Sequence, residues 1–286
     1  MRPRVAYQGE PGAFAEEAAR SFFADPDATA VPTWRAVFEA VRDRRVDAGV
    51  VPIENSRAGT IRENHDLLFE FHDDGIRIQG ETSVLVRLAL LALPGRALED
   101  IERVYSHPQA LAQADAFLRT RAWQVLTTYN TAGAAKLIAE RAEHGAAAIA
   151  SPRVAGIYGL DVLVDDVQTG RDERTRFAVI SCAPLIADSI RAGAARGVPR
   201  TTLVFAVRNV PGSLHRALGA FAARGLNLSR LESRPWIGRG ARWEYVFWVD
   251  LDIDPADPVA AEALDELGTE TELVRVLGTY PRASED

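Results

Sequence analysis

Residues 34–53 read WRAVFEAVRDRRVDAGVVPI and combine two periodicities. Trp34, Val37, Phe38 and Val41 recur at the i, i+3, i+4, i+7 spacing that places apolar side chains on one face of a helix. Residues 48–53 then form a continuous apolar run, which is typical of a strand covered on both faces. A helix that leads directly into such a strand indicates a parallel sheet flanked by helices.

The same alternation continues toward the N-terminus. Residues 4–9 and 29–33 have strand character, and residues 12–24 between them have the pattern of an amphipathic helix. Together with residues 34–53 they give the order βαβαβ. This order predicts an α/β protein with a mainly parallel sheet and right-handed crossovers.

Downstream, a β-rich stretch at 76–94 precedes a second α/β series that extends to residue 159. Residues 160–167 and 175–182 are expected as strands that return to the first unit. Two units joined by two chain crossings form a hinged pair. Ligands bind such sheets in the cleft beyond the carboxyl ends of the strands.

The C-terminal third has a different pattern. Residues 183–200 have little periodicity, and we expect a linker with one helical turn. Residues 201–280 follow the order βαββαβ, which predicts a separate ferredoxin-like unit.

Composition excludes several classes of function. The chain of 286 residues has a formal net charge of −7 and no basic run, which argues against nucleic-acid binding. No apolar run approaches the ~20 residues that cross a bilayer, and no signal-peptide pattern is present, so we expect a cytoplasmic protein without membrane contact. Lys136 is the only lysine, which disfavours Schiff-base chemistry. Because Cys182 is the only cysteine and the five histidines lack ligand spacing, we expect no disulfide and no metal site.

Polar residues and glycines gather where expected strands meet expected helices. Five segments share this position: residues 7–14, 52–59, 106–109, 130–131 and 175–177. Backbone N–H groups at a helix start suit a carboxylate. Each segment taken singly is also explained as an ordinary turn or helix cap. The residues by themselves therefore predict a two-lobed α/β protein with a cleft that accepts an anion.

Taken together, these segments resemble the motifs of the prephenate dehydratase family. QGEPGAF at 8–14 is similar to its opening motif, PIENSRAG at 52–59 to its second motif, SHPQAL at 106–111 to its third and TRF at 175–177 to its last. The resemblance implies a carbon–oxygen lyase of phenylalanine biosynthesis that converts prephenate to phenylpyruvate with loss of carbon dioxide and water, without a cofactor.

The resemblance also implies how the chain is divided. A two-lobed catalytic domain, similar to periplasmic binding proteins, is expected over residues 1–182. Lobe 1 would comprise about 1–80 and 160–182, and lobe 2 about 81–159. The ferredoxin-like unit at 201–280 is similar to the ACT regulatory domain.

Carried over position by position, the motifs assign residues to the reaction. The expected catalytic residues are Thr175, at the departing hydroxyl, Arg176, as an anchor for a carboxylate, and Phe177. The expected substrate-binding residues are Gly12, Ala13, Phe14, Asn55, Ser56, Gly59, Ser106, His107, Gln109 and Thr131. The family usually has Asn where this chain has Glu173, so we expect a different local charge near Thr175.

Two further motifs resemble the effector site of ACT domains. The expected regulatory residues are Gly212, Ser213, Leu214, Asn227, Glu232, Ser233, Arg234 and Pro235. Ser213 replaces the usual Ala and remains small. The resemblance implies phenylalanine as effector, bound between two copies of the domain, and hence a homodimer or homotetramer.

Two alternatives stay open at this point. An arogenate dehydratase performs the same chemistry on the transaminated substrate, and Glu173 would suit its ammonium group. A non-catalytic amino-acid sensor is the rival from another class, because two-lobed α/β folds also serve as binding proteins. The TRF segment at 175–177 disfavours the sensor.

Overall fold

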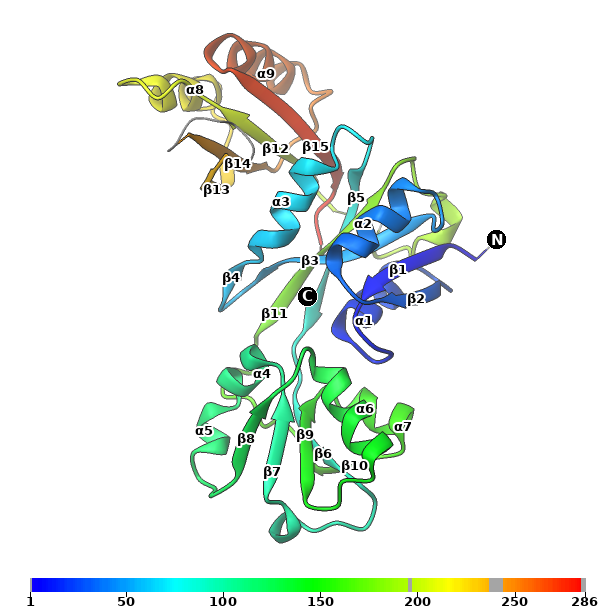
Figure 1. Cartoon of the computed structure of the whole chain (residues 1–286). Helices are drawn as coiled ribbons and strands as arrows, with labels where there is room; N and C mark the ends of the chain where they lie inside the picture. Colours follow the sequence, from blue (N-terminus) through cyan, green and yellow to red (C-terminus); the bar gives the residue numbers. More distant parts are fainter. Residues whose placement is uncertain (1, 195–196, 237–243, 284–286) are drawn as a thin grey trace.

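The computed structural model describes residues 2–194, 197–236 and 244–283. Three β-sheets follow one another along the long axis of the molecule, each accompanied by helices (Figure 1). The sheet of lobe 1 lies in the middle, with lobe 2 at one end and the C-terminal domain at the other. The expected division into two lobes and a ferredoxin-like domain is confirmed.

Lobe 1 is built on a mixed sheet. Its strands are β1 (Arg4–Gln8), β2 (Asp27–Val31), β3 (Ala48–Asn55), β4 (Gly59–Thr60), β5 (Arg77–Leu85) and β11 (Arg174–Ser181). The order is β2-β1-β3-β11-β5, and β4 pairs with β3. β1, β2 and β3 are parallel, as the βαβαβ pattern predicts, whereas β11 is antiparallel to both of its neighbours.

The helices α1 (Phe14–Phe22), α2 (Trp34–Arg42) and α3 (Arg62–Glu70) cover this sheet. α1 packs on one face, and α2 and α3 pack on the other. α2 begins after Thr33, whose side chain accepts a hydrogen bond from the Ala36 N–H, and it buries Val37, Phe38 and Val41. The apolar stripe that predicts this helix is therefore the surface that packs on the sheet.

Lobe 2 contains β6 (Ala89–Ala92), β7 (Arg103–Ser106), β8 (Gln124–Thr127), β9 (Ala146–Ala150) and β10 (Asp161–Val164) in the order β10-β6-β9-β7-β8. Its helices are α4 (Pro108–Gln113), α5 (Asp115–Leu118), α6 (Thr131–Arg141) and α7 (Arg153–Tyr158), and a 3₁₀ turn, η1, spans Leu98–Asp100. The expected lobe boundaries are wrong at both crossings. β10 pairs with β6 of lobe 2, and β5 continues to Leu85 in lobe 1. Apolar alternation predicts a strand but does not specify the sheet edge that accepts it.

The C-terminal domain follows the expected βαββαβ order. It comprises β12 (Pro199–Ala206), α8 (Ser213–Ala222), β13 (Leu228–Pro235), β14 (Tyr245–Leu251), α9 (Pro258–Glu270) and β15 (Leu273–Pro281). The sheet order is β13-β14-β12-β15. α8 and α9 cover one face around Phe205 and Phe221. The linker before it contains one 3₁₀ turn, η2 (Ala187–Ser189), as expected.

The other face of this sheet packs against lobe 1. Val204 and Trp248 share an apolar cluster with Leu68 and Phe71, which lie in and directly after α3. Gly278 of β15 meets the backbone of Ile78 in β5 so closely that a Cβ at Gly278 would overlap the Ile78 carbonyl. The C-terminal domain is therefore packed directly against the sheet of lobe 1.

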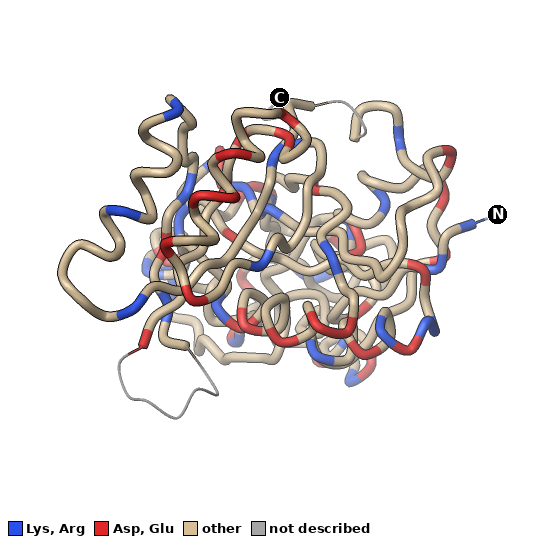
Figure 2. Tube along the Cα trace, turned by 90° about the horizontal axis from the view of Figure 1, so that it is seen from above, with Lys and Arg blue, Asp and Glu red and all other residues tan. Residues whose placement is uncertain are grey.

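Charged side chains of both signs are interspersed along the chain when the molecule is viewed from above (Figure 2). No helix in the described ranges has the length and apolar character needed to span a lipid bilayer. The same ranges contain no group of three or more His, Cys, Asp or Glu side chains arranged to hold a metal ion.

His65 of α3 lies at the contact between the C-terminal domain and lobe 1. Its ring centroid is 4.6 Å from that of Trp248, and its Nδ1 atom is 3.2 Å from the Ile61 carbonyl oxygen. Burial, assisted by the positive charge of Arg230, lowers the pKa of His65 to about 3. The imidazole is therefore neutral in the folded protein at ordinary pH.

This lowered pKa predicts that stability decreases as the pH falls below 6.5, because the unfolded chain then binds a proton at His65 that the folded chain excludes. The cost is up to ~1.4 kcal/mol per pH unit. We expect His65→Asn to flatten the decline of the urea midpoint between about pH 7.5 and about pH 5. Exposed His144 supplies the control: His144→Asn should leave the slope as in the wild type. Equal slopes for wild type and His65→Asn would contradict the assignment.

Candidate active site

A cavity of about 530 Å³ opens between the two lobes, a size that suits a small organic ligand. It lies beyond the carboxyl ends of β1, β3 and β7, where the sequence predicts a ligand. Both lobes and the returning strand β11 contribute to its wall. The expected residues that line it are Ala13, Phe14, Asn55, His107, Gln109, Thr131, Thr175 and Phe177.

Asn55 and Thr175 form the centre of this wall. They are opposite each other in the β3–β11 pairing, and the Asn55 Nδ2 donates a hydrogen bond of 3.1 Å to the Thr175 Oγ1. The Asn55 Oδ1 accepts hydrogen bonds from the backbone N–H groups of Arg57 and Ala58, at 3.0 and 2.8 Å. These two bonds fix the amide so that its N–H points at Thr175. The Thr175 hydroxyl therefore accepts from Asn55 and keeps its own proton for donation into the cavity.

The cavity wall contains few charged groups. Glu63 is the only Asp, Glu, Lys or Arg among the described lining residues. Two longer helices begin at the cavity instead, α1 at Phe14 and α6 at Thr131. The first N–H groups of a helix have no partner within the helix, and the helix dipole makes this end positive. An anionic ligand would therefore be bound mainly by backbone N–H groups.

Asn130 adds a donor that the sequence suggests only as a helix cap. Its Oδ1 caps α6 by accepting from the Gly133 N–H at 2.5 Å. Its Nδ2 is buried at the cavity wall without a hydrogen-bond partner among the described residues. A buried donor without a partner calls for an explanation, and a ligand oxygen in the cavity would supply the acceptor.

His107 caps α4 with its side chain, since its Nδ1 accepts from the Gln109 N–H at 3.3 Å. Burial lowers the pKa of His107, so the ring is neutral at physiological pH. A neutral ring whose Nδ1 accepts carries its proton on Nε2. His107 therefore adds an uncharged donor to the wall. Gln113, Tyr129 and Trp34 also line the cavity and lie outside the motifs from which site residues were assigned.

Four expected substrate-binding residues have structural roles outside the cavity lining. The Gly12 N–H is occupied by the Glu16 carboxylate at 2.6 Å, and Gly12 has a φ of 90°, which favours glycine. The Ser56 Oγ accepts from the Arg174 N–H, and Gly59 forms the turn of the β3–β4 hairpin. The Ser106 hydroxyl donates to the Ile149 carbonyl inside lobe 2. The structure therefore places these four residues behind the cavity wall, where they support the residues that line it.

Arg176 is the clearest correction. Successive residues of a strand point to opposite faces, so Thr175 and Phe177 face the cavity and Arg176 faces away. Its guanidinium lies 2.9 Å from the Asp250 carboxylate of the C-terminal domain and 3.2 Å from that of Glu54. The expectation that Arg176 anchors a substrate carboxylate is wrong, because its charge is already paired on the other side of the sheet.

Glu173, the departure from the family pattern, is almost fully buried beside the cavity. The Gln113 side chain donates to its Oε1, and the Arg57 guanidinium lies 4.0 Å from its Oε2. The Oε2 atom has no hydrogen bond among the described residues. The Glu173 carboxylate, with one oxygen that accepts no hydrogen bond from the described residues, thus lies two positions before Thr175 in the chain.

The lobes also contact each other beside the cavity. The Glu10 carboxylate of lobe 1 accepts from the Tyr129 hydroxyl at 2.9 Å and pairs with Lys136 at 3.0 Å, both of lobe 2. Arg153 and Glu17 form a second ion pair of 3.2 Å across the gap. These contacts connect the two lobes beside the cavity and give the single lysine a structural role.

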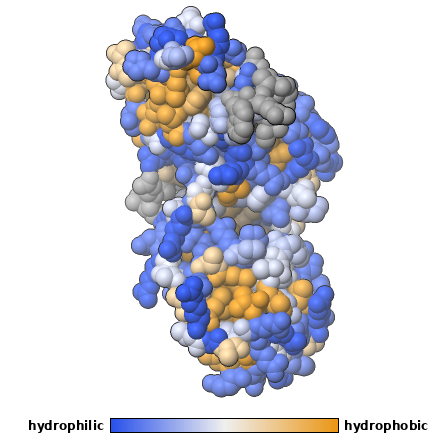
Figure 3. Space-filling view, turned by 60° about the vertical axis from the view of Figure 1, so that its left-hand side comes forward, coloured by the Kyte–Doolittle hydropathy of each residue, from blue (hydrophilic) through white to orange (hydrophobic). Residues whose placement is uncertain are grey.

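The expected regulatory residues do not form one group. A second cavity, of about 440 Å³, lies in the C-terminal domain and is lined by Ser213 and Leu214 together with Val210, Tyr245 and Phe247. Figure 3 shows an apolar area on this domain, and Val210 and Tyr245 are among its exposed apolar side chains.

The expected strand residues are divided between two environments. Glu232 and Arg234 face lobe 1, where they contact Thr60 and Asp66. Ser233, Pro235 and Asn227 are exposed, and Gly212 precedes α8 with a φ of 83°.

These features define a two-lobed enzyme with an interlobe cleft and a C-terminal ferredoxin-like domain. Residues 5–184 match the family model for prephenate dehydratase, and residues 201–269 match that for the ACT domain. The chain belongs to the prephenate dehydratase family, and it is a lyase of the prephenate and arogenate dehydratase type.

Similar proteins come from plants and bacteria. The chain is 40% identical to arogenate dehydratase/prephenate dehydratase 2 of Arabidopsis thaliana, over 98% of this chain and 73% of the relative. It is 32% identical to the prephenate dehydratase of Arthrobacter aurescens solved in complex with L-Phe, with a TM-score of 0.84 over 99% of this chain and 91% of that chain. A structure described as GqqA, a novel type of quorum quenching acylase, is 34% identical with a TM-score of 0.85, over 98% of both chains.

The Asn55–Thr175 hydrogen bond yields a direct test. Asn55→Asp keeps the acceptor for the two backbone N–H groups but replaces the donor toward Thr175 with an acceptor. The Thr175 hydroxyl would then donate to the new carboxylate and turn away from the cavity. We expect the dehydratase turnover to fall about 100-fold with the fold retained. Ser189→Ala, in the linker turn η2 and outside the cavity, should keep turnover within about threefold; equal losses in both variants would contradict this geometry.

Proposed function

We propose that the protein is a prephenate dehydratase that converts prephenate to phenylpyruvate, carbon dioxide and water. The observation that carries the proposal is the Thr175 hydroxyl, oriented by Asn55 as a donor into a cavity lined by helix starts. This is the equipment needed to hold a small dianion and to assist departure of a hydroxyl group.

The reaction requires one proton. The ring carboxylate of prephenate leaves as carbon dioxide, its electron pair enters the ring, and the hydroxyl on the opposite carbon takes a proton and leaves as water. A threonine hydroxyl is too weak an acid to supply this proton alone. Thr175 instead donates a hydrogen bond that stabilises the negative charge developing on the departing oxygen. The proton that completes the leaving water molecule is taken up from the solvent.

The distribution of charge in the cavity fits this reaction. The charge of the ring carboxylate disappears in the transition state, so a strong cation at that carboxylate would stabilise the ground state and slow the reaction. The described lining residues include no Arg or Lys. Neutral donors, namely the N–H groups at the start of α1 and α6, bind the side-chain carboxylate without this cost.

Arogenate is the alternative substrate, and one observation favours it. Arogenate carries an ammonium group where prephenate has a keto group, and buried Glu173 has, beside the cavity, a carboxylate oxygen that accepts no hydrogen bond from the described residues. The relatives from Arabidopsis thaliana and Petunia hybrida are named arogenate dehydratases, some of them also prephenate dehydratases. Incubation of the purified protein with each compound, followed by detection of phenylpyruvate or phenylalanine, separates the two activities. A protein that leaves both compounds unchanged would refute the proposed function.

Substitution of Thr175 tests the assigned role. Thr175→Val keeps the shape of the side chain and removes the hydroxyl, so we expect kcat to fall by at least about 1000-fold with substrate binding retained. Thr175→Ser keeps the hydroxyl and should retain a fair share of the activity. The measurements are steady-state turnover and substrate binding by calorimetry. Near-normal turnover of the valine variant would remove Thr175 from the mechanism.

For the ACT domain we propose feedback inhibition by phenylalanine. The second cavity, whose apolar lining includes Leu214 and Phe247, supports binding of an aromatic amino acid at the start of α8. The relative from Arthrobacter aurescens was solved with L-Phe. We further propose a homodimer or homotetramer, in which the partner's ACT domain would complete the site.

Inhibition is measurable directly. Millimolar phenylalanine should slow turnover of the wild type, and Leu214→Ala should raise the concentration needed by about tenfold, because it removes apolar contact in the cavity. Val259→Ala, an exposed position on α9, is the matched control and should respond like the wild type. Turnover that is insensitive to millimolar phenylalanine would refute this regulation.

A further inference from the structure

The strands β3 and β11 present different chemistry on their two faces. Thr175 is paired with Asn55, and both line the cavity. Arg176 is paired with Glu54, and both point to the opposite side of the sheet. Thr175 and Arg176 are thus adjacent in the chain, but their side chains lie on opposite faces of the sheet.

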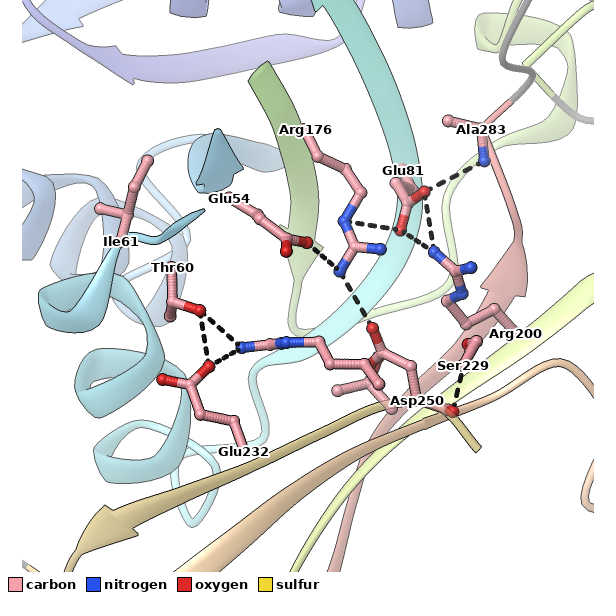
Figure 4. A network of polar contacts seen from close by, with 12 residues as sticks. Glu54, Thr60, Ile61, Glu81, Arg176, Arg200, Ser229, Glu232, Asp250 and Ala283 are labelled. Carbon is pink, nitrogen blue, oxygen red and sulfur yellow. Dashed lines mark hydrogen bonds and ion pairs between the residues drawn. The ribbon is translucent and has the colours of Figure 1, made fainter. Parts of the chain in front are cut away.

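On that opposite side Arg176 meets the ACT domain. Its Nη2 atom donates to the Asp250 Oδ2 of β14 at 2.9 Å, and its Nε lies 3.6 Å from the Glu81 Oε2 of β5 (Figure 4). The same Nη2 is 3.2 Å from the Glu54 Oε2. Arg176 of β11 therefore contacts carboxylates on three other strands, β3 and β5 of lobe 1 and β14 of the ACT domain.

A second arginine crosses the interface in the opposite direction. Arg200 of β12 in the ACT domain pairs with Glu81 of lobe 1 at 3.2 Å (Figure 4). It also pairs with Asp252 of its own domain at 2.9 Å. The side chains of Glu81, Arg200 and Asp250 are only 2%, 4% and 1% exposed. Each domain thus contributes a positive and a negative charge, and each arginine is paired with a buried carboxylate of the other domain.

The charge on Asp250 is maintained by its surroundings. Burial alone would raise the pKa of Asp250, but the positive charges of Arg176 and Arg230 and a hydrogen bond from the Thr202 hydroxyl outweigh it and lower the pKa. The Thr202 hydroxyl in turn lies 2.6 Å from that of Tyr280. Asp250 is thus held in place by the ACT sheet itself, and a movement of β14 would displace the partner of Arg176.

The hairpin that carries Asn55 is held by the same domain. The Thr60 hydroxyl donates to the Glu232 Oε2 at 2.5 Å (Figure 4). Arg230 pairs with the same oxygen at 2.6 Å. Thr60 lies on β4, which pairs with the end of β3 next to Asn55. Both partners of the Asn55–Thr175 hydrogen bond are therefore close along the chain to contacts with the ACT domain.

We propose that Arg176 is a positioning residue: through its ion pair with Asp250, the ACT domain fixes β11 against β3 and so sets the Asn55–Thr175 hydrogen bond. The inference rests on the dehydratase activity proposed above and names the route by which the ACT domain acts on it. A shift of β14 would be transmitted to Thr175 through a single residue.

The test compares two variants of the full chain that each remove one ion pair between the domains. Asp250→Asn removes the partner of Arg176 and keeps the shape of the side chain. Asp73→Asn removes the 2.7 Å pair with Arg275, which lies next to neither Asn55 nor Thr175 in the chain. We expect Asp250→Asn to lower kcat about tenfold with KM within about twofold. Asp73→Asn should leave both constants close to the wild-type values.

Hydrogen exchange measured by mass spectrometry supplies a readout that needs no turnover. Peptides covering β11 and residues 52–60 should exchange faster in Asp250→Asn than in the wild type and in Asp73→Asn. If Asp250→Asn does not fold, Glu54→Gln takes its place, because Glu54 is partly exposed and also pairs with Arg176. For that variant we expect kcat to fall about threefold and the same peptides to exchange faster.

The outcomes are distinct. Unchanged exchange and unchanged kcat in Asp250→Asn would overturn the inference. Equal losses of kcat in Asp250→Asn and Asp73→Asn would overturn it as well, because the Arg176–Asp250 pair would then act only as a contact between domains. A wild type inactive on both prephenate and arogenate would refute the proposed function. In that case the exchange of β11 still decides whether Asp250 positions the strand.

Discussion

The insertion of β11 between β3 and β5 is the constraint on which the rest of the molecule depends. The chain leaves lobe 1 after β5, builds lobe 2 and returns through the middle of the first sheet. This return places Thr175 beside Asn55, although 120 positions separate them in sequence. It also places both crossings between the lobes next to the cavity, so that any closure of the cleft bends the chain close to Thr175.

The chemistry of the cavity follows from what surrounds this strand. Helix starts and neutral side chains line it, and the described charged residues nearby are mostly paired on other surfaces. Backbone N–H groups attract an anion through fixed partial charges, which require no mobile cation. For a substrate that loses one of its two negative charges, a moderate and fixed field favours the transition state over the bound substrate.

Much of this arrangement could be predicted from the sequence because it depends on local patterns. The stripe at Trp34, Val37, Phe38 and Val41 predicts α2, and the run at 48–53 predicts β3. Both patterns depend only on which residues of a short segment are buried, and this is visible in the order of apolar residues. The motifs place Asn55 and Thr175 at strand ends that meet. By contrast, what Arg176 faces depends on which strands and which domain lie next to β11 in the folded chain. Likewise, β10 joins the sheet of lobe 2 because the edge of β6 is open to it. Neither property is encoded in a window of neighbouring residues.

The ion pairs between the domains are not explained by stability alone. Apolar contacts around Trp248, Val204 and Phe71 already hold the ACT sheet on lobe 1. Replacing a buried ion pair with apolar groups of similar volume is often neutral or stabilising by ~1–4 kcal/mol. An apolar contact, however, tolerates sliding, whereas Arg176 and Arg200 each fit a carboxylate only at one register of the two sheets. The charges therefore favour one relative position of the domains, and one of these arginines, Arg176, is the residue adjacent to Thr175.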